Sequence, residues 1–146
     1  MCVREAANME SLLDSCTLIN LPREANRQGS VTEVHRLVDV PFDIARVYYL
    51  YDVPGGASRG GHSHKELKQL VVAASGSFDV MLDDGRERKT IHLNRPYLGL
   101  YVVPGVWREL HNFSSGGICL VLASMPYDAN EYIRGYENFL AYRKLK

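Results

Sequence analysis

The chain has 146 residues, and its 17 lysine and arginine residues balance 17 aspartate and glutamate residues. This length fits one compact domain with a substantial core. Neither sign of charge gathers into a long block, so the sequence indicates neither a nucleic-acid-binding nor a membrane-binding surface and favours a small-molecule ligand.

Residues 1–16 are expected to form an N-terminal extension that precedes a single domain at 17–146. The first 15 residues include acidic side chains and lack the apolar core of a signal peptide. No run approaches the roughly 18 apolar residues of a membrane span. Cys2, Cys16 and Cys119 form no CxxC pair, which favours reduced, mostly structural thiols. We therefore expect a cytoplasmic protein.

Between about residues 17 and 122 the apolar residues come in short runs separated by turn signals, a pattern typical of strands. Asp84 and Gly85 lie between two of these runs, as in the turn of a β-hairpin. The sequence therefore predicts an all-β domain. The expected strands are, in chain order, 16–21, 30–38, 45–53, 69–74, 77–84, 89–94, 99–104 and 119–124.

Two further patterns add detail. In the strand expected at 45–53, Arg46 and Tyr48 share one face, and that face or its opposite must line a core or cavity. After Pro126, apolar residues recur at spacings of three and four, as on one face of a helix, and Asp128 fits the N-cap position. We expect a C-terminal helix packed on the domain. Its apolar face would comprise Tyr132, Ile133, Tyr136, Phe139 and Leu140.

The segment 56–76 carries the most informative pattern, because it places two histidines two residues apart behind a run of glycines. Its spacing resembles the first motif of the cupin superfamily, whose members are small antiparallel β-barrels. The resemblance implies a double-stranded β-helix with jelly-roll-like antiparallel sheets. The matching positions are Gly56, His62, His64, Gln69 and Gly76.

In metal-binding cupins a glutamate usually stands at the place of Gln69, and a second motif supplies a histidine at the place of Arg108. A guanidinium has no lone pair to give and stays protonated. A divalent metal requires roughly three or four protein ligands, which two histidines and a neutral amide beside a fixed positive charge do not supply. We therefore expect neither a metal nor another cofactor, and interpret His62 and His64 as acid/base groups.

Five short motifs, one of which contains the histidine pair, occur in the order RVYY, HSHK, DDG, GLYVVPGVW and NFSSG. Together they resemble the WxcM-like, FdtA-type branch of the cupins over about residues 27–142. Members of this branch are sugar 3,4-ketoisomerases that act on thymidine-diphosphate-linked (dTDP-linked) 4-keto-6-deoxyglucose. The resemblance implies a metal-independent isomerase that makes the 3-keto sugar, a precursor of 3-amino sugars in surface polysaccharides. It also implies a homodimer with exchanged N-terminal strands.

The chemistry of ketoisomerisation fits the histidine pair. The carbonyl moves from C4 to C3 through an enediol, so one proton must leave C3 and another must reach C4. Imidazole titrates near neutrality, and histidines at i and i+2 of one strand share a face. We therefore expect His62 and His64 to be catalytic, although a vestigial metal pair would look alike. The Tyr48 hydroxyl is expected to relay a proton or hold the enediol oxygen, with core packing as the alternative.

Other polar residues are expected to bind the substrate. Arg59, in the loop before the histidines, suits a diphosphate, and Arg46 shares the face of Tyr48. Arg108 and Asn112 are four residues apart and would share an inward face of one strand. There Arg108 would lower the pKa of the histidines or hold a sugar oxygen. A solvated loop for Arg59, and a rim ion pair with Glu109 or Asp79 for Arg108, are the alternatives. Gln69 completes the expected set.

Two other functions stay open. A related cupin sugar-nucleotide epimerase would use the same base at carbons that flank the ketone. A non-catalytic cupin would bind the nucleotide sugar without changing it.

Overall fold

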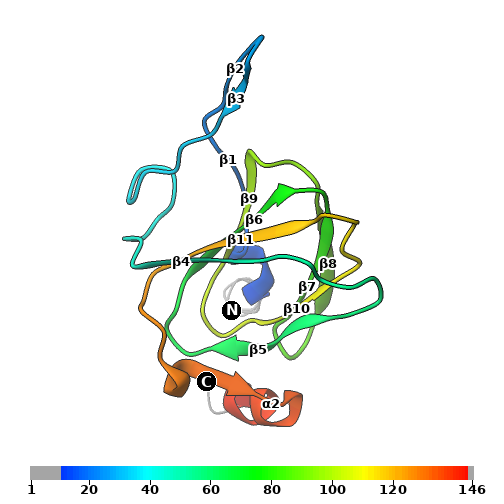
Figure 1. The fold of residues 1–146 in the computed structure, drawn as a ribbon. Helices are drawn as coiled ribbons and strands as arrows, with labels where there is room; N and C mark the ends of the chain where they lie inside the picture. The colour runs from blue at the N-terminus through cyan, green and yellow to red at the C-terminus, as the bar shows by residue number, and fades with distance from the viewer. Residues whose placement is uncertain (1–10, 145–146) are drawn as a thin grey trace, which may run out of the picture.

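The computed structural model describes residues 11–144, and two five-stranded sheets that face each other make up most of it. Strand order is β1-β9-β6-β11-β4 in the first sheet and β12-β5-β10-β7-β8 in the second. Figure 1 shows both sheets wrapping around a common interior, with α2 lying beside β5. The strands are β1 (Leu18–Asn20), β2 (Glu24–Asn26), β3 (Gly29–Val31), β4 (Arg46–Leu50), β5 (Arg59–His64), β6 (Gln69–Ser75), β7 (Phe78–Asp83), β8 (Arg88–Leu93), β9 (Leu98–Val102), β10 (Trp107–His111), β11 (Ile118–Ala123) and β12 (Tyr132–Arg134).

Every pairing between these strands is antiparallel. The prediction of an all-β, cupin-like antiparallel fold with a C-terminal helix is confirmed, and seven strands of the two five-stranded sheets overlap runs expected from sequence. Four strands, β2, β5, β10 and β12, are absent from the expected set, and β5 and β10 are the two of these that lie in the interior of a five-stranded sheet. Neither contains an uninterrupted apolar run, since β5 reads RGGHSH and β10 reads WRELH, so periodicity alone does not detect them.

The core between the sheets is formed by inward side chains such as Val71, Val80 and Leu100, all almost fully buried. Leu13 and Cys16 belong to the same cluster, at 2% and 4% exposure. Leu13 lies in a short 3₁₀ turn, η1 (Leu12–Ser15), so the core reaches back into the segment expected to be an extension. The part of that extension at 1–10, including Cys2, lies outside the described residues.

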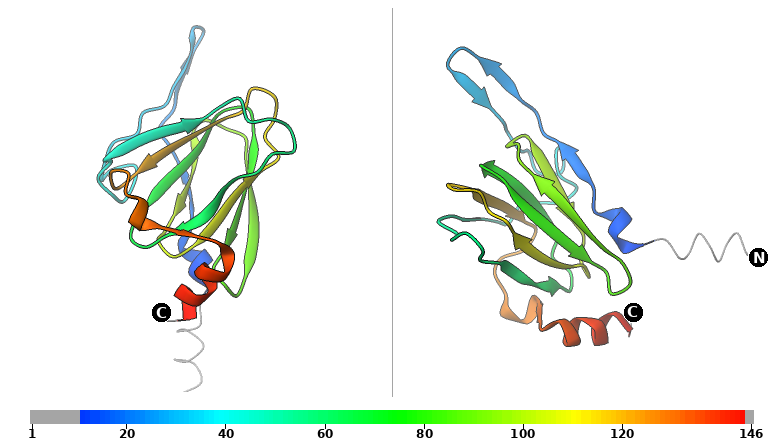
Figure 2. Two further views of the ribbon diagram at one scale, coloured as in Figure 1. Left: turned by 60° about the horizontal axis from the view of Figure 1, so that its bottom comes forward. Right: turned by 90° about the vertical axis from the view of Figure 1, so that its right-hand side faces the viewer.

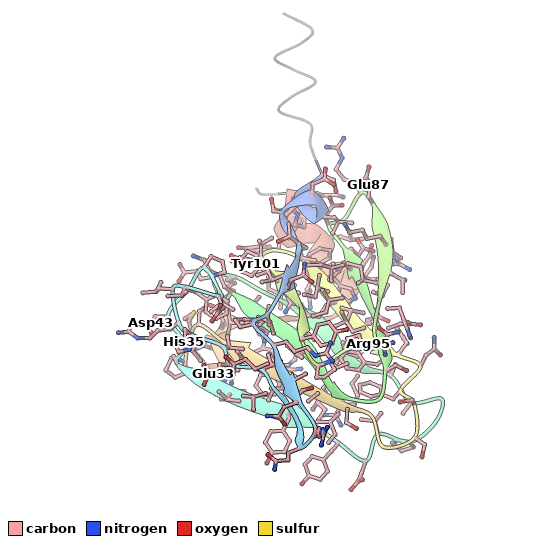
Figure 3. The ribbon with its side chains drawn as sticks, turned by 90° about the horizontal axis from the view of Figure 1, so that it is seen from above. Glu33, His35, Asp43, Glu87, Arg95 and Tyr101 are labelled. Atoms are coloured by element: carbon pink, nitrogen blue, oxygen red, sulfur yellow. The ribbon has the colours of Figure 1, made fainter. Side chains whose placement is uncertain are left out.

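The central strand β6 is buried on both faces for most of its length. Its inner face joins the core between the sheets, while Leu70 and Val72 on its outer face pack under Val40 and Phe42. These covering residues belong to the segment 32–45, which runs over the outside of the first sheet. Figure 3 shows Glu33, His35 and Asp43 at the surface of this segment.

The expected strand at 30–38 is wrong apart from its first two residues. Strand β3 ends at Val31 and pairs only with β2, and this two-stranded hairpin, the arm, projects away from the barrel (Figures 1 and 2). Every residue of its two strands is exposed, including Val31 at 61%. Beyond Val31 the chain joins neither five-stranded sheet. Its apolar side chains pack on the outer face of β6, where no neighbouring strand is placed to pair with its backbone.

The expected C-terminal helix is partly wrong. Asp128 does act as an N-cap, but of a short 3₁₀ turn, η2 (Ala129–Glu131). The chain then forms β12, which pairs with β5 through Tyr132↔His64 and Arg134↔His62. Only after Gly135, whose φ is 84°, does the α-helix α2 (Tyr136–Lys144) begin. The free edge of β5 explains the difference, since its unpaired backbone groups are satisfied by a strand and not by a helix.

Helix α2 packs on the second sheet through Phe139, which meets Trp107, Met81 and Ile133 in a separate apolar cluster. Trp107 is 5% exposed and donates its indole Nε1–H to Glu109 at 2.8 Å. Among residues 11–144, no helix has the length and apolar character needed to cross a membrane.

Candidate active site

The interior of the barrel holds a cavity of about 380 Å³, lined by inward side chains from β4, β5, β6, β7, β9, β10, β11 and β12. Apolar residues such as Val71, Val80 and Val121 supply part of its wall. Of the site residues expected from sequence, six line the cavity and two do not. The six are Arg46, Tyr48, Arg59, His62, Gln69 and Arg108.

The two histidines lie on β5 with their rings close together, 4.7 Å apart between centroids at an angle of 83°. Tyr132 of β12 covers them, with its ring 5.0 Å from His62 and 4.4 Å from His64. His62 and Tyr132 line the cavity, whereas His64 is fully buried and does not. Nε2 of His62 and both ring nitrogens of His64 are buried without a hydrogen-bond partner among the described residues.

The electrostatic surroundings keep both imidazoles neutral. Burial, together with the Arg108 and Arg134 cations, lowers the pKa of His62 from 6.5 to about 3. Burial and Arg108 likewise lower the pKa of His64 from 6.5 to about 2, with smaller effects from the other cations and from His62. Arg108 has this influence because it is the direct cross-strand partner of His62 on β10. Each histidine therefore presents a lone pair at neutral pH.

Arg108 is almost completely buried and has no carboxylate partner among the described residues. Its Nε and Nη2 groups donate to the carbonyl oxygen of Val106 at 3.2 and 3.1 Å, and Nη1 donates to Oε1 of Gln69. Burial lowers the pKa of Arg108 to about 10, which leaves it a cation at neutral pH. The alternative of a rim ion pair is excluded because Glu109 binds His111 and Trp107 instead, and Asp79 binds His92 and Asn112.

The expectation that Asn112 shares an inward face with Arg108 is wrong. The register of β10 against β5 shifts between Arg108 and Leu110, and the strand ends at His111. Asn112 then takes a positive φ of 56° and donates its side-chain amide to Asp79 at 2.8 Å. It is exposed on the outside of the barrel and cannot reach the cavity.

On the opposite wall, the Tyr48 hydroxyl accepts a hydrogen bond from Nε2 of Gln69 at 3.0 Å. Burial raises the pKa of Tyr48, so its hydroxyl keeps its proton at neutral pH. The Arg46 guanidinium lies over the rings of Tyr48 and Tyr127, 5.0 and 5.6 Å from their centroids. Its Nε and Nη2 atoms are buried and have no hydrogen-bond partner within residues 11–144.

The cavity is lined by four arginines, and no aspartate or glutamate is found among the described residues that line it. Arg134 is one of the four, and its guanidinium lies 4.5 Å from the centroid of the Tyr132 ring. Guanidinium groups bind phosphate through paired hydrogen bonds, so this set suits an anionic ligand.

The sequence reasoning missed Arg134, Tyr132 and Tyr127. The signal available was Gly135, which separates the period-two pattern of β12 from the helix.

The donor set does not fit a metal ion. Within residues 11–144, no three or more His, Cys, Asp or Glu side chains are placed to hold one. Gln69, at the usual ligand position of metal-binding cupins, has both ends of its amide engaged by Arg108 and Tyr48.

Comparison with known proteins identifies the family. The family described as FdtA (WxcM-like, C-terminal) matches residues 14–144. The chain belongs to this family. A relative from Aneurinibacillus thermoaerophilus, TDP-4-oxo-6-deoxy-alpha-D-glucose-3,4-oxoisomerase, is 45% identical over 125 residues, covering 86% of this chain and 90% of the relative.

Solved structures agree with this assignment. The 3,4-ketoisomerase QdtA from Thermoanaerobacterium thermosaccharolyticum, in a variant with one histidine replaced by asparagine, is in complex with TDP-4-keto-6-deoxyglucose. It has a TM-score of 0.88 and 40% identity, over 90% of this chain and 95% of that one. WlaRB, a TDP-quinovose 3,4-ketoisomerase from Campylobacter jejuni, has a TM-score of 0.82 and 45% identity, over 86% and 97%. The family resemblance drawn from the ordered motifs is thus confirmed.

The low histidine pKa values predict a stability that falls in acid. In the unfolded chain His64 binds a proton as the pH drops through 6.5, whereas in the folded protein it stays neutral until about pH 2. Because the unfolded state binds more protons in this window, the free energy of unfolding decreases as the pH decreases. Between about pH 7.5 and about pH 5, His64 alone should account for a loss of about 2 kcal/mol.

Urea unfolding of the wild type and of His64→Asn at both pH values measures this contribution. The variant should lose less stability than the wild type between the two conditions, whatever its stability at the higher pH. An equal loss in both proteins would contradict a neutral, buried His64.

Proposed function

We propose that this protein is an isomerase that converts dTDP-4-keto-6-deoxyglucose into the dTDP-linked 3-keto-6-deoxy hexose, with His62 as the base. The single observation that carries the proposal is the free, buried Nε2 of His62 in a cavity lined by four arginines and no carboxylate among the described residues. A neutral imidazole faces the space for the sugar, and cations line the same space for a diphosphate. The activities named for the 45% and 40% identical relatives support the same reaction.

The reaction needs only proton transfers. His62 takes the proton from C3, the C–H electrons form a C3=C4 double bond, and the C4 carbonyl oxygen becomes an enolate oxygen. Protonation of that oxygen gives the enediol. Loss of the O3 proton and protonation of C4 then leave the carbonyl at C3. One C–H and one O–H bond are broken and one of each is formed, so no oxidant or reductant is required, and we propose that no metal takes part.

The cavity-lining side chains suit distinct roles. We assign both transfers at carbon to His62, because it is the imidazole that reaches the cavity. The His64 ring packs against the rings of His62 and Tyr132, and we assign it the role of fixing the orientation of those two rings. Tyr48 lines the same cavity, and we assign its hydroxyl to donating to the oxygen at C4. Arg46 and Arg59 suit the diphosphate together with Arg134. Asn112 has no role in this scheme.

We place the reaction in the cytoplasm, in the synthesis of 3-amino-3,6-dideoxy sugars for surface polysaccharide. The product is a ketone at C3, which is the group that an aminotransferase acts on to make a 3-amino sugar. Cys16 and Cys119 are buried free thiols, which supports a reducing compartment.

Turnover of dTDP-4-keto-6-deoxyglucose by the purified protein in deuterated water tests the function. We expect a 3-keto product with deuterium at C4, because His62 exchanges its proton with water while the enediol lives. Chelator should leave the rate unchanged. A C5 epimer would instead identify an epimerase, and binding without change would identify a non-catalytic protein. Loss of turnover on chelation, restored by one ion, would contradict the metal-free mechanism.

Replacing the base should reduce turnover and leave binding intact. His62→Asn keeps much of the shape but removes the group that titrates, so the rate should fall on the order of 10²-fold or more. The affinity for dTDP, measured by calorimetry, should hardly change. His64→Asn is the matched comparison and should cost less, because His64 does not line the cavity. Near-normal turnover of His62→Asn with undiminished C4 labelling would assign the base to another residue.

We further propose a homodimer in which the N-terminal arm of each chain lies on its partner. The arm pairs with no other strand of its own chain and exposes Val31, whereas β1 before it pairs with β9. Light scattering at micromolar concentration should give about twice the 16.5 kDa chain mass. Val31→Asp should shift the mass towards the monomer, and Thr90→Asp, exposed on β8 of the second sheet, should not. A monomer mass for the wild type would refute the dimer.

A further inference from the structure

We propose that Gln69 is a positioning residue that turns the Tyr48 hydroxyl proton towards the substrate, as the middle member of a hydrogen-bonded relay formed by Arg108, Gln69 and Tyr48. The inference rests on the proposed ketoisomerase function and deepens the account of the same cavity. It changes the role expected for Gln69 from binding the sugar to orienting the group that binds it.

Hydrogen-bond direction fixes the relay. Arg108 can only donate, so the atom of Gln69 that faces its Nη1 must be the amide oxygen Oε1. The other end of the amide is then Nε2, which carries protons and lies 3.0 Å from the Tyr48 hydroxyl oxygen. Tyr48 must therefore accept this bond, and its own proton has to point elsewhere.

The remaining direction for that proton is the cavity. Among residues 11–144, no acceptor is found for the Tyr48 O–H, and Tyr48 lines the cavity that His62 also lines. A phenol that accepts from Gln69 can still donate one hydrogen bond. In the proposed reaction the oxygen at C4 gains negative charge, and a donor already aimed at that oxygen stabilises it most.

The rigidity of the relay comes from its burial and its anchoring. Gln69 and Arg108 are 2% and 4% exposed, and the Val106 carbonyl oxygen holds two further nitrogens of the guanidinium. The three residues lie on β10, β6 and β4, so the relay spans both sheets across the interior. In such a low-dielectric setting the charge of Arg108 polarises the amide, and the amide polarises the phenol.

The acidity of Tyr48 agrees with this geometry. Burial raises the pKa of Tyr48, while Arg108 and the hydrogen bond from Gln69 act in the opposite direction. Both groups that favour proton donation by the phenol are thus members of the relay. A cation whose guanidinium nitrogens are held by Val106 and Gln69 can in this way support charge on the substrate oxygen.

The decisive substitution is Gln69→Glu, which keeps the shape of the side chain but replaces its donor by a second acceptor. The new carboxylate accepts from Arg108 and also from the Tyr48 hydroxyl, which turns the proton away from the substrate. We expect kcat to fall about 10²-fold with KM little changed. Asn94→Asp is the charge-matched control, since Asn94 is exposed and does not line the cavity, and it should keep normal kinetics.

A second substitution separates the relay from simple packing. Gln69→Met neither accepts nor donates, so Tyr48 loses its orientation but can still donate to the substrate. The relay predicts that kcat falls in the order wild type, Gln69→Met, Gln69→Glu. If Gln69 only fills space, the isosteric glutamate should be the milder change, and that order would overturn the proposal. All assays contain chelator, because the carboxylate adds a third donor beside two histidines.

A double-mutant cycle tests whether Gln69 acts through Tyr48. Tyr48→Phe should cost about 10²-fold in kcat in the wild type but little in the Gln69→Glu background, where the hydroxyl no longer serves the substrate. Additive losses would overturn the relay. Unfolding by urea verifies that each variant is folded. If Gln69→Glu does not fold, the same cycle is run with Gln69→Met. In that background the loss of kcat caused by Tyr48→Phe should be smaller than in the wild type but not abolished.

One readout does not depend on turnover. The phenolate absorbance of each enzyme minus that of its Tyr48→Phe counterpart reports the ionisation of Tyr48 alone. Gln69→Glu should shift this ionisation to higher pH, because the phenolate loses a donor and gains a neighbouring negative charge. An unshifted ionisation would overturn the relay even in an active enzyme. A wild type that fails to isomerise the keto sugar would instead refute the proposed function, and a shifted ionisation would still support the relay.

Discussion

The buried charge of Arg108 is the constraint around which the interior of this barrel is organised. Removing a guanidinium from water without a carboxylate partner is costly, and among residues 11–144 only the Val106 carbonyl and the Gln69 amide offset that cost. Together with burial, which is the larger cause, this positive charge depresses the pKa of His62 and His64, and it makes a cation site unfavourable. An anion entering the cavity would complete the charge balance that the fold leaves open.

The second structural requirement is the short strand β12, which closes the site on the side of β5. Glu131 anchors it, since its carboxylate accepts the backbone N–H of Leu67 at 2.7 Å and also that of Glu66. The anchored loop follows directly after His64, so the same contact holds both the histidine strand and the Tyr132 ring that covers it. Backbone pairing between β5 and β12 therefore sets the geometry of the histidine pair as much as packing does.

Sequence patterns recovered the part of the site that depends on local spacing. The i, i+2 rule puts His62 and His64 on one face, and the cupin motif identifies Gln69 and the strand that carries it. The sequence-based predictions that failed were those that depended on pairing between distant segments. Tyr132 and Ile133 fit a helical period equally well, and only the open edge of β5 makes them a strand. The bulge that turns Asn112 outward is a property of two strands together and leaves no trace in the residues of one.

An imidazole with a pKa of about 3 is too weak a base to take a proton from a sugar carbon, and in the proposed reaction this limit explains why the arginines and His62 line one cavity. After burial, the causes of the low pKa of His62 are the cations Arg108 and Arg134. A diphosphate bound among the arginines would neutralise part of that field, and the enolate would place a negative charge closer still. Both changes raise the proton affinity of His62 when substrate is present. By the same linkage, a protonated His62 would strengthen binding of the anionic intermediate. The proton affinity of His62 and the affinity for the substrate are therefore coupled through the buried positive charge of Arg108.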